Sequence, residues 1–375
     1  MPLEIRPVSS RRDLSRFIRL PWRIYRNHQL WVPPLVYERK RFLDRTKNPF
    51  FTHGEAEYFL AWRDGEPVGR ITAQIDHDFN DFHKNEWGMF GFFESEDDPE
   101  IAAALLETAA EWLRARGRDR MVGPMDFTMN DESGIVIEGH DLPPRIKQPY
   151  HPPYYQGLME GAGMQKAMDL YMYNLEVEDR DKVLPIIWEL DEKLEPEHGI
   201  KLRHMRKRDL QAELDRFLEI YNIAWSKNWG FVPIRREEME HTAKEMRPIL
   251  DEDWMMACET ADGETVGIAL TIADINQVLK RMNGRVLPFG WLKFLWYRPR
   301  IDRLRVGFLG VKPEYQHTGV AAAMYAEHFR VAARKRQSGG EIGWILETNT
   351  AMNRAMEAMG GRIVKRYRVY ERVFT

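Results

Sequence analysis

Residues 308–324 read FLGVKPEYQHTGVAAAM, which contains the end of a strand, a turn and the start of a helix. The apolar run that ends at Val311 is typical of a buried strand, and an amphipathic helix pattern begins after Gly319. A glycine in such a turn lets the backbone approach a ligand without an intervening Cβ. The first N–H groups of the helix have no partner within it and can hold phosphate oxygens. The alternative is an ordinary β–α turn that binds no ligand.

The chain repeats one unit. DGEPVG at 64–69 recurs as DGETVG at 262–267, 198 residues later, and MEGAG at 159–163 matches MEAMG at 356–360, 197 residues later. Two motifs at nearly one offset indicate a duplication. Length alone also favours two domains. We place them at residues 1–178 and 179–375.

Each copy is predicted to have the same order of elements. An Asp-Gly turn between strand-like runs indicates a hairpin, and a further strand and a helix with apolar residues at helical spacing follow. The predicted elements are hairpin strands at 58–62 with 67–75 and at 254–259 with 265–272, third strands at 89–93 and 306–311, and helices at 101–116 and 320–335. The fold class is therefore mixed α/β (α+β), with two tandem domains, each a largely antiparallel sheet flanked by helices.

The turn after Val311 resembles the acyl-CoA signature of the GNAT N-acetyltransferase superfamily, which reads Gln/Arg-x-x-Gly-x-Gly/Ala after a strand. Gln316, Gly319 and Ala321 match it, and Asn349 resembles the residue that caps the helix of the family's second motif. The resemblance covers the second half well and the first half by the order of its elements only. It implies two GNAT-like domains and a site for acetyl-CoA or another acyl-CoA. The implied cofactor-binding residues are Leu309, Gly310, Val311, Gln316, His317, Thr318, Gly319, Val320, Ala321 and Asn349.

The second motif departs from the family at the position of a frequent tyrosine, usually taken to protonate the departing thiolate. Met356 stands there, and a thioether cannot donate a proton. Coenzyme A can leave unaided, because a thiol pKa of about 8.5 needs little help near neutral pH. For a general base we choose Glu347, which follows the next predicted strand, although it could be only a surface or salt-bridged side chain.

The first copy lacks the signature loop. Two residues separate Pro99 from Ala102, whereas seven separate Pro313 from Ala321. The shortened turn is also acidic, which suits a helix start and repels a pyrophosphate. We therefore expect the first copy not to bind CoA.

Two segments are candidates for the acceptor site. The first copy has a long insertion, residues 123–155, which lines an acceptor pocket or packs one half on the other. Residues 225–233 lie between the two helices before the second hairpin, where relatives often form the acceptor site, although core packing of the tryptophans is the alternative. The predicted acceptor-binding residues are Trp225, Asn228, Trp229, Asn130, Glu132 and Tyr150.

Residues 286–298 are apolar with basic residues between. We expect them to be buried against the protein; an acyl-chain pocket and a membrane surface are the alternatives. Asp76, His77, Asp78 and His83 lack the fixed spacing of a metal site, so we predict a solvated hairpin loop and no metal.

The bulk composition favours a cytoplasmic protein without nucleic-acid partners. The formal net charge is -3, and Cys258 is the one cysteine, in an apolar run that indicates a buried strand. No window reaches the roughly 20 apolar residues of a membrane span.

Together these patterns predict an acyl-CoA-dependent N-acyltransferase, in which a small-molecule or protein amine attacks the thioester directly. One alternative is an aminoacyl transferase that uses aminoacyl-tRNA; the near-neutral charge speaks against it. The other is a non-catalytic acyl-CoA sensor, motivated by the missing tyrosine. The identity of the acceptor, the acyl length and the oligomeric state are not encoded in any recognisable pattern.

Overall fold

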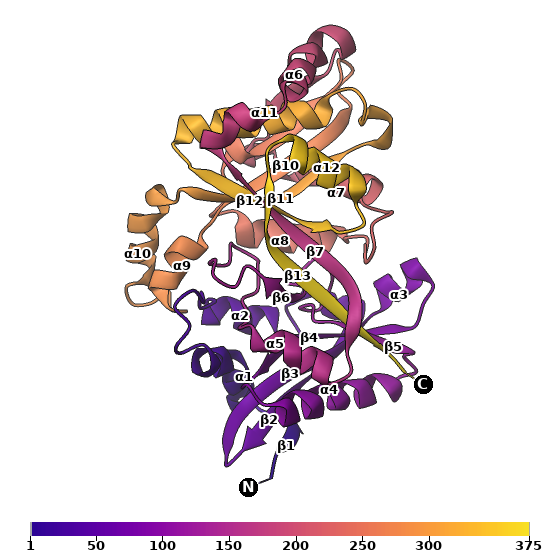
Figure 1. The fold of residues 1–375 in the computed structure, drawn as a ribbon, viewed down its shortest axis with the longest axis vertical. Helices are drawn as coiled ribbons and strands as arrows, with labels where there is room; N and C mark the ends of the chain where they lie inside the picture. Colours follow the sequence, from indigo (N-terminus) through magenta and orange to yellow (C-terminus); the bar gives the residue numbers. More distant parts are fainter. Residues whose placement is uncertain (1, 375) are drawn as a thin grey trace. The chain divides into compact units, whose positions relative to one another are not determined.

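The computed structural model describes residues 2–374, and its chain divides into two compact units (Figure 1). Unit 1 consists of residues up to Leu170, Asn276–Pro299 and the last segment from Lys365. Unit 2 consists of Tyr171–Ile275 and Arg300–Val364. The two units are therefore not separated by a single boundary in the sequence. Unit 1 includes two segments that follow the predicted boundary at residue 178, and unit 2 begins at Tyr171, before that boundary.

Unit 1 is a sheet with helices on both faces. Its strands run in the order β1-β2-β3-β4-β5-β13-β7, and β6 pairs with β13. β4 and β5 pair in parallel, at Trp87–Met89 with Arg120–Val122. Its elements from the first copy are β1 (Glu4–Pro7), α1 (Arg11–Ile24), α2 (Val36–Phe42), β2 (Gly54–Arg63), β3 (Glu66–Asp76), α3 (His77–His83), β4 (Trp87–Ser95), α4 (Pro99–Arg114), β5 (Arg120–Gly123), β6 (Ile135–Glu138), α5 (Tyr154–Gly161) and the start of β7 (Gln165–Glu176).

Unit 2 repeats the design. Its strands follow the order β7-β12-β11-β10-β9-β8, and β11 pairs in parallel with β12. Its elements are α6 (Pro185–His198), β8 (Lys201–His204), α7 (Leu210–Ala224), α8 (Arg236–Met246), β9 (Met255–Glu259), β10 (Thr265–Ala273), β11 (Arg303–Val311), α11 (Val320–Lys335), β12 (Gly339–Leu346), α12 (Thr350–Ala358) and the start of β13 (Arg362–Val373). Two short helices, α9 (Asn276–Met282) and α10 (Gly290–Tyr297), leave this order after β10 and belong to unit 1.

Alternation along the hairpin strands builds a core on each face of each sheet. In β2, Phe59 and Ala61 face the cluster with α4 and α5, while Tyr58 and Leu60 face the cluster with α1. In β9, Met256 and Cys258 pack with α11, whereas Met255 and Ala257 pack with α7. This period of two confirms the predicted strands and the mixed fold class, and it confirms Cys258 as a buried strand residue.

The turns follow the sequence closely. Asp64 and Gly65 adopt φ of 53° and 79° between β2 and β3, a conformation that suits these residue types. Gly163 and Gly360 follow the ends of α5 and α12 with φ of 79° and 74°. Their positive φ ends each helix at the predicted residue.

The closing strand of each copy runs from one unit into the other. β13 begins in unit 2, but from Lys365 it belongs to unit 1, where Tyr370 pairs with Gly123 of β5 and Arg368 with Ile135 of β6. β7 begins in unit 1 and from Tyr171 belongs to unit 2. The last strand of the second copy therefore completes the sheet of the first.

Two local expectations were wrong. Asp76 does not lie in a solvated loop: it is buried, caps α3 by accepting from the Phe79 amide, and contacts the Nδ1 of His53 at 3.1 Å. Residues 286–298 are not buried against the protein: Leu287 is 75% exposed and Trp296 is 64% exposed. Helical caps and surface exposure depend on tertiary contacts, which the local pattern of these segments does not specify.

Candidate active site

The β11–α11 turn has the form expected of an anion-binding turn. After β11 the chain makes the short 3₁₀ helix Pro313–Tyr315, and Gly319, with φ of 94°, begins α11. The N–H groups of the first turn of α11 precede any helical carbonyl that could accept from them, and the helix dipole adds positive potential there. Gln316 and His317 are exposed in the turn. The turn thus offers backbone donors and accessible side chains to an anion.

Gly319 also has a packing role that the sequence did not reveal. A Cβ at this position would lie 2.9 Å from the Leu190 carbonyl oxygen and 3.2 Å from the Leu190 Cβ, both on α6. The glycine is therefore required by its positive φ and by the close approach of α6, in addition to any ligand. A β-branched residue at Gly319 would disturb the packing of α6, which makes this position a poor test of ligand binding.

The two parallel strands of unit 2 separate beside this turn. Their pairing runs from Arg303 with Gly339 to Val306 with Ile342, although both strands continue beyond that point. A bulge opposite Leu270 and Thr271 falls at Gly307, which is exposed. A Cβ on Gly307 would meet nothing closer than 3.8 Å. Past Val306, the edge of β11 that faces β12 is therefore not paired with β12, and a small side chain at Gly307 would fit without a clash.

The predicted strand residues lie on this segment of β11. Leu309, Gly310 and Val311 pair with β10 on the other edge, opposite Ala269, Ile268 and Gly267. Gly310 has little room for a side chain, because a Cβ there would lie 2.8 Å from the Phe308 ring. The edge of β11 toward β12 is consequently the edge on which an extended ligand arm could pair with backbone groups.

The second predicted motif lies at the end of β12. The side-chain oxygen of Asn349 accepts from the Met352 amide at 3.1 Å and so caps α12. Glu347 follows β12 and is half-buried, and its carbonyl oxygen accepts from the Asn353 side chain at 3.4 Å. The role of Asn349 toward a cofactor and that of Glu347 as a base stay predictions.

Methionine at the usual tyrosine position is a core residue in both copies. Met159 and Met356 are both fully buried, in the clusters beneath the two sheets. Two tyrosines lie near Met356: Tyr173 donates to the Asn353 side-chain oxygen at 3.1 Å, and the hydroxyl of Tyr325 lies 3.4 Å from the Met352 sulfur. Burial raises the pKa of both hydroxyls. Neither contact identifies a replacement proton donor.

An aromatic cluster lies against β11 on the face that carries α7. Trp225 has its ring 5.1 Å from that of Phe308 and 5.5 Å from that of Tyr221. Asn228 and Trp229 follow it and are half-buried, and the Asn228 amide donates to the Trp225 carbonyl at 2.8 Å. Trp225 thus packs against β11, the strand that carries the predicted cofactor residues Leu309, Gly310 and Val311. It contacts this strand at Phe308, just after Val306, where the pairing with β12 ends.

The equivalent gap in the first copy is filled by the chain itself. β4 and β5 separate after Met89 and Val122, and Gly91, which pairs with Thr72 of β3, lies directly before a bulge at Phe92 and Phe93. The Met125 amide donates to the Phe90 carbonyl at 2.8 Å, and the Met125 carbonyl accepts from Gln74 at 2.7 Å. A Cβ on Gly91 would lie 2.0 Å from the Met125 oxygen. The predicted insertion therefore closes the first copy at the place where the second is open.

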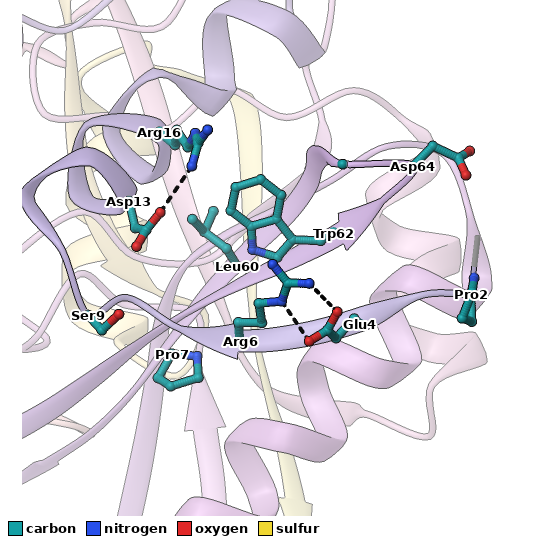
Figure 2. A pocket seen from close by; sticks show the side chains of 11 residues that line it. Pro2, Glu4, Arg6, Pro7, Ser9, Asp13, Arg16, Leu60, Trp62 and Asp64 are labelled. Carbon is teal, nitrogen blue, oxygen red and sulfur yellow. Dashed lines mark hydrogen bonds and ion pairs between the residues drawn. The ribbon is translucent and has the colours of Figure 1, made fainter.

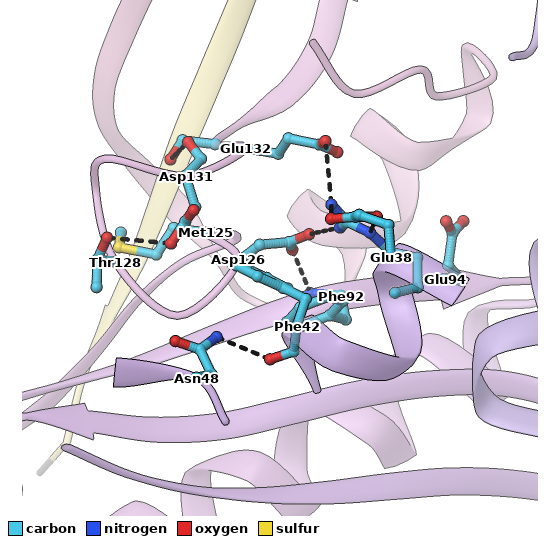
Figure 3. Close-up of polar contacts among 12 residues, drawn as sticks. Glu38, Phe42, Asn48, Phe92, Glu94, Met125, Asp126, Thr128, Asp131 and Glu132 are labelled. Atoms are coloured by element: carbon cyan, nitrogen blue, oxygen red, sulfur yellow. Dashed lines mark hydrogen bonds and ion pairs between the residues drawn. The ribbon is translucent and has the colours of Figure 1, made fainter. Parts of the chain in front are cut away.

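A group of acidic residues surrounds this closure (Figure 3). The Phe92 amide, in the bulge of β4, donates to Asp126 at 3.0 Å, and the other oxygen of Asp126 lies 3.5 Å from Arg39. Arg39 also lies 3.9 Å from Glu132 and pairs with Glu38 at 2.6 Å. Burial, and then the nearby charge of Glu132, raise the pKa of Asp126 to about 8. One guanidinium therefore faces three carboxylates, and protonation of Asp126 relieves its repulsion with Glu132.

The three acceptor residues predicted in the insertion have different surroundings. Glu132 belongs to the acidic group, and the Asn130 amide donates to the Thr128 hydroxyl at 3.1 Å. Tyr150 instead packs its ring 5.7 Å from that of Tyr25, and its hydroxyl lies 3.2 Å from His28. An acceptor role for these residues stays a prediction.

The acidic turn before α4 has a structural role of its own. Asp98 caps α4 by accepting from the Glu100 amide at 2.9 Å, and Arg63 pairs with Asp98 and Glu100 at 2.6 Å. This is the dipole-stabilising arrangement that the sequence allowed as an alternative.

A further hollow of about 630 Å³ lies beside β1, the start of α1 and β2 (Figure 2). Its charged groups pair with one another: Arg6 with Glu4, and Arg16 with Asp13 at 3.2 Å. Trp62 has the Arg16 guanidinium 4.9 Å from its ring. None of the predicted site residues lines this hollow, so we assign it no part in the chemistry.

The structure also reveals a repeat that sequence reasoning missed. Tyr25 packs beside Trp31 as Tyr221 packs beside Phe231, and Trp31-Val32-Pro33 recurs 200 residues later as Phe231-Val232-Pro233. That recurrence was visible in the sequence, and it gives Trp225 the position in the second copy that Tyr25 has in the first. Phe308, Asp126 and Arg39 carried no such signal.

Comparisons with known proteins agree with this architecture. A sequence model of the acetyltransferase (GNAT) family matches residues 18–129. The bacterial ceramide synthase of Caulobacter vibrioides is 35% identical over 99% of this chain and 97% of its own, and protein YghO of Escherichia coli is 33% identical over 98% and 95%. The chain belongs to the GNAT superfamily.

Solved structures place this GNAT protein among the tandem members. A tandem GNAT protein from the clavulanic acid biosynthesis pathway superposes with a TM-score of 0.58 at 13% identity, over 99% of this chain and 98% of that one. A GCN5-related N-acetyltransferase from Sphaerobacter thermophilus gives 0.53 at 15%, over 99% and 95%. These likenesses concern the fold.

The family match corrects one expectation. It falls on the first copy, which was expected to resemble the family by the order of its elements alone. In that copy α3 alone stands between β3 and β4, whereas in the second copy α9 and α10 stand between β10 and β11. The match to the family model and the turn that resembles the acyl-CoA signature thus lie in different copies of this tandem GNAT acyltransferase.

Proposed function

We propose that the chain transfers an acyl group from a coenzyme A thioester, bound at the β11–α11 turn, to the primary amine of a long-chain amino alcohol. The observation that carries the proposal is the contrast between Gly307 in β11 and Gly91 in β4. A Cβ on Gly307 would meet nothing closer than 3.8 Å, on a strand edge not paired with β12, whereas a Cβ on Gly91 would lie 2.0 Å from the Met125 oxygen. This contrast supports a thioester bound beside the third strand of the second copy.

The donor side of the proposal rests on backbone groups. The N–H groups at the start of α11 would hold the pyrophosphate, and the edge of β11 near Gly307 would pair with the pantetheine arm. A backbone N–H on this strand would stabilise the oxyanion as the amine attacks. The C–N bond forms, the C–S bond breaks, and the thiolate leaves without the usual tyrosine.

The acceptor side rests on the aromatic cluster and on the named relative. A ceramide is the N-acyl derivative of a long-chain amino alcohol, and the relative named bacterial ceramide synthase matches nearly the whole chain. Trp225 and Phe308 supply an apolar surface beside the proposed thioester, which suits an amine that carries a hydrocarbon chain. Glu347 is the proposed acceptor of the ammonium proton.

The test is turnover with a defined pair of substrates. The purified protein is mixed with palmitoyl-CoA or acetyl-CoA and with sphinganine, and the N-acyl product and free thiol are measured by mass spectrometry and a thiol reagent. We expect product with sphinganine and little with short amines such as ethanolamine. Tight CoA binding without product from any amine would favour the sensor alternative instead.

A charge change in the turn tests where the donor binds. Gln316→Glu combined with His317→Glu places negative charge beside the proposed pyrophosphate at two exposed positions. We expect CoA affinity, measured by calorimetry, to fall by about tenfold or more, equivalent to about 1.4 kcal/mol, with an unchanged unfolding temperature. Unchanged affinity would place the pyrophosphate elsewhere.

A further inference from the structure

Helices α9 and α10 form a hairpin that is anchored to unit 1 and stand side by side in Figure 1. The Trp22 indole donates to the Asn283 side chain at 2.9 Å, and the Val36 amide donates to the Gly284 carbonyl at 3.1 Å. The side chain of Asn276 donates to the Pro144 carbonyl at 2.9 Å. The hairpin therefore has a fixed base, although its outer part projects its side chains outward.

The outer part, residues 286–297, is the most apolar exposed surface of the described chain. Among residues 2–374, fourteen large apolar side chains are exposed, and seven of them lie here. They are Val286, Leu287, Phe289, Trp291, Leu292, Leu295 and Trp296. Contiguous apolar exposure of this kind marks an interaction surface rather than ordinary scatter.

The charged residues of this segment are all basic. Residues 275–301 contain no acidic side chain, in a protein whose net charge is -3. The six basic residues of the segment are Lys280, Arg281, Arg285, Lys293, Arg298 and Arg300. An apolar face whose own segment carries only basic charges matches an anionic lipid surface, which offers negative headgroups above hydrocarbon.

The dimensions favour a helix that lies on the membrane. α10 has eight residues, or about 12 Å of helix, far short of the roughly 30 Å of a bilayer core. Among the described residues, none of the helices has the length and hydropathy to cross a membrane. Trp291, Trp296 and Tyr297 are of the types that settle at the level of the headgroups.

We propose that the α9–α10 hairpin docks this protein on the surface of a membrane that contains anionic lipid. Leu287, Phe289 and Leu295 enter the acyl boundary, and Arg285, Lys293 and Arg298 contact headgroup phosphates. The docking does not depend on acyl-CoA or on turnover, and so it stands apart from the proposed function. It would nonetheless present the protein to a substrate that resides in lipid.

Sedimentation with vesicles tests the docking directly. The full-length protein without substrates is mixed with vesicles of phosphatidylcholine alone or with phosphatidylglycerol added. We expect binding to the mixed vesicles, weakened by salt, and much less binding to phosphatidylcholine alone. Absence of binding to the mixed vesicles would overturn the proposal.

Two variants separate the apolar and the charged contributions. Leu287→Ser with Leu295→Ser removes apolar contact, and Arg285→Glu with Arg298→Glu reverses two charges. Each should weaken binding to the mixed vesicles by about tenfold or more. Leu184→Ser with Ile186→Ser and Arg11→Glu with Arg12→Glu are the matched controls, at exposed positions outside the hairpin, and should bind as wild type.

Two other results would contradict the docking. Equal loss of binding in the hairpin variants and their controls would indicate a general effect of composition. The wild-type protein could instead self-associate in a concentration-dependent way without binding vesicles. If Leu287→Ser with Leu295→Ser abolished that self-association, the hairpin would be a contact between copies of the chain. Unfolding temperatures of all variants establish that the differences arise in folded protein.

Discussion

The Phe92 amide, in the bulge of β4 directly after Gly91, donates a 3.0 Å hydrogen bond to the carboxylate of Asp126. The strand edge beside it is occupied by Met125. In the first copy, Asp126 and Met125 therefore hydrogen-bond to backbone groups of the third strand. In the second copy, we propose that the thioester binds along the corresponding strand. A duplicated site has been closed from within rather than simply lost.

This asymmetry predicts different effects of substitution at Gly91 and at Gly307. Gly91→Ala forces a methyl group against the Met125 carbonyl, and we expect a loss of about 1–3 kcal/mol or more in the free energy of unfolding. Gly307→Ala has room and should fold normally, but its methyl group intrudes where the thioester would lie. Denaturant unfolding and CoA calorimetry measure both. A Gly307→Ala protein with wild-type CoA affinity would contradict the proposed location.

We expect one CoA to bind per chain. Reversing a charge in the acidic turn before α4 of the first copy should not create a second CoA site. Asp97→Lys removes an exposed negative charge at the turn of the first copy. If repulsion alone excluded CoA there, the variant would bind two equivalents. We expect calorimetry to give one, because Met125 still fills the gap.

Glu347→Gln tests the proposed base. Gln keeps the size of the side chain but cannot take the ammonium proton, so we expect kcat to fall by roughly 10²–10⁴ and the acidic limb of the pH–rate profile to flatten. CoA affinity should hardly change. Turnover within a few-fold of wild type, with the same pH profile, would leave proximity and the basicity of the free amine as the mechanism.

Asp126 should make the stability of the protein depend on pH. Burial and Glu132 raise its pKa from 3.8 to about 8, so between these values the folded protein keeps a proton that the unfolded chain has lost. The free energy of unfolding therefore falls as pH rises through this window, by at most about 1.4 kcal/mol per pH unit. Asp126→Asn stays neutral and should flatten the slope, seen by thermal unfolding from acid to alkaline pH. The exposed control Asp81→Asn should keep the wild-type slope, and an equally steep slope in Asp126→Asn would contradict the assignment.

Local patterns predicted the elements well. The Asp64-Gly65 turn, the strand that ends at Val311 and the helix that starts at Val320 depend on residues close together in the sequence, and the structure places all three as expected. The family assignment from the turn is likewise confirmed by the comparisons.

What escaped prediction depends on distant contacts. Nothing within 362–373 indicates that β13 pairs with β5 and β6. The close approach of Leu190 to Gly319, the filling of the first gap by Met125 and the raised pKa of Asp126 each arise from segments that meet only in the folded chain. The exposure of residues 286–298 contradicted the expectation that they are buried against the protein. That expectation followed the general rule that apolar residues are usually buried unless a partner is to cover them.

The path of β13 has a consequence for biosynthesis. A ribosome that has completed the first copy has not yet made the strand that pairs with β5 and β6, since Arg366–Val373 follow the rest of the second copy in the sequence. Until that strand is made, the nascent first copy carries unpaired strand edges, which are prone to aggregate. Prematurely terminated chains would keep those edges, and we expect them to be held by chaperones and degraded rather than released as a working half.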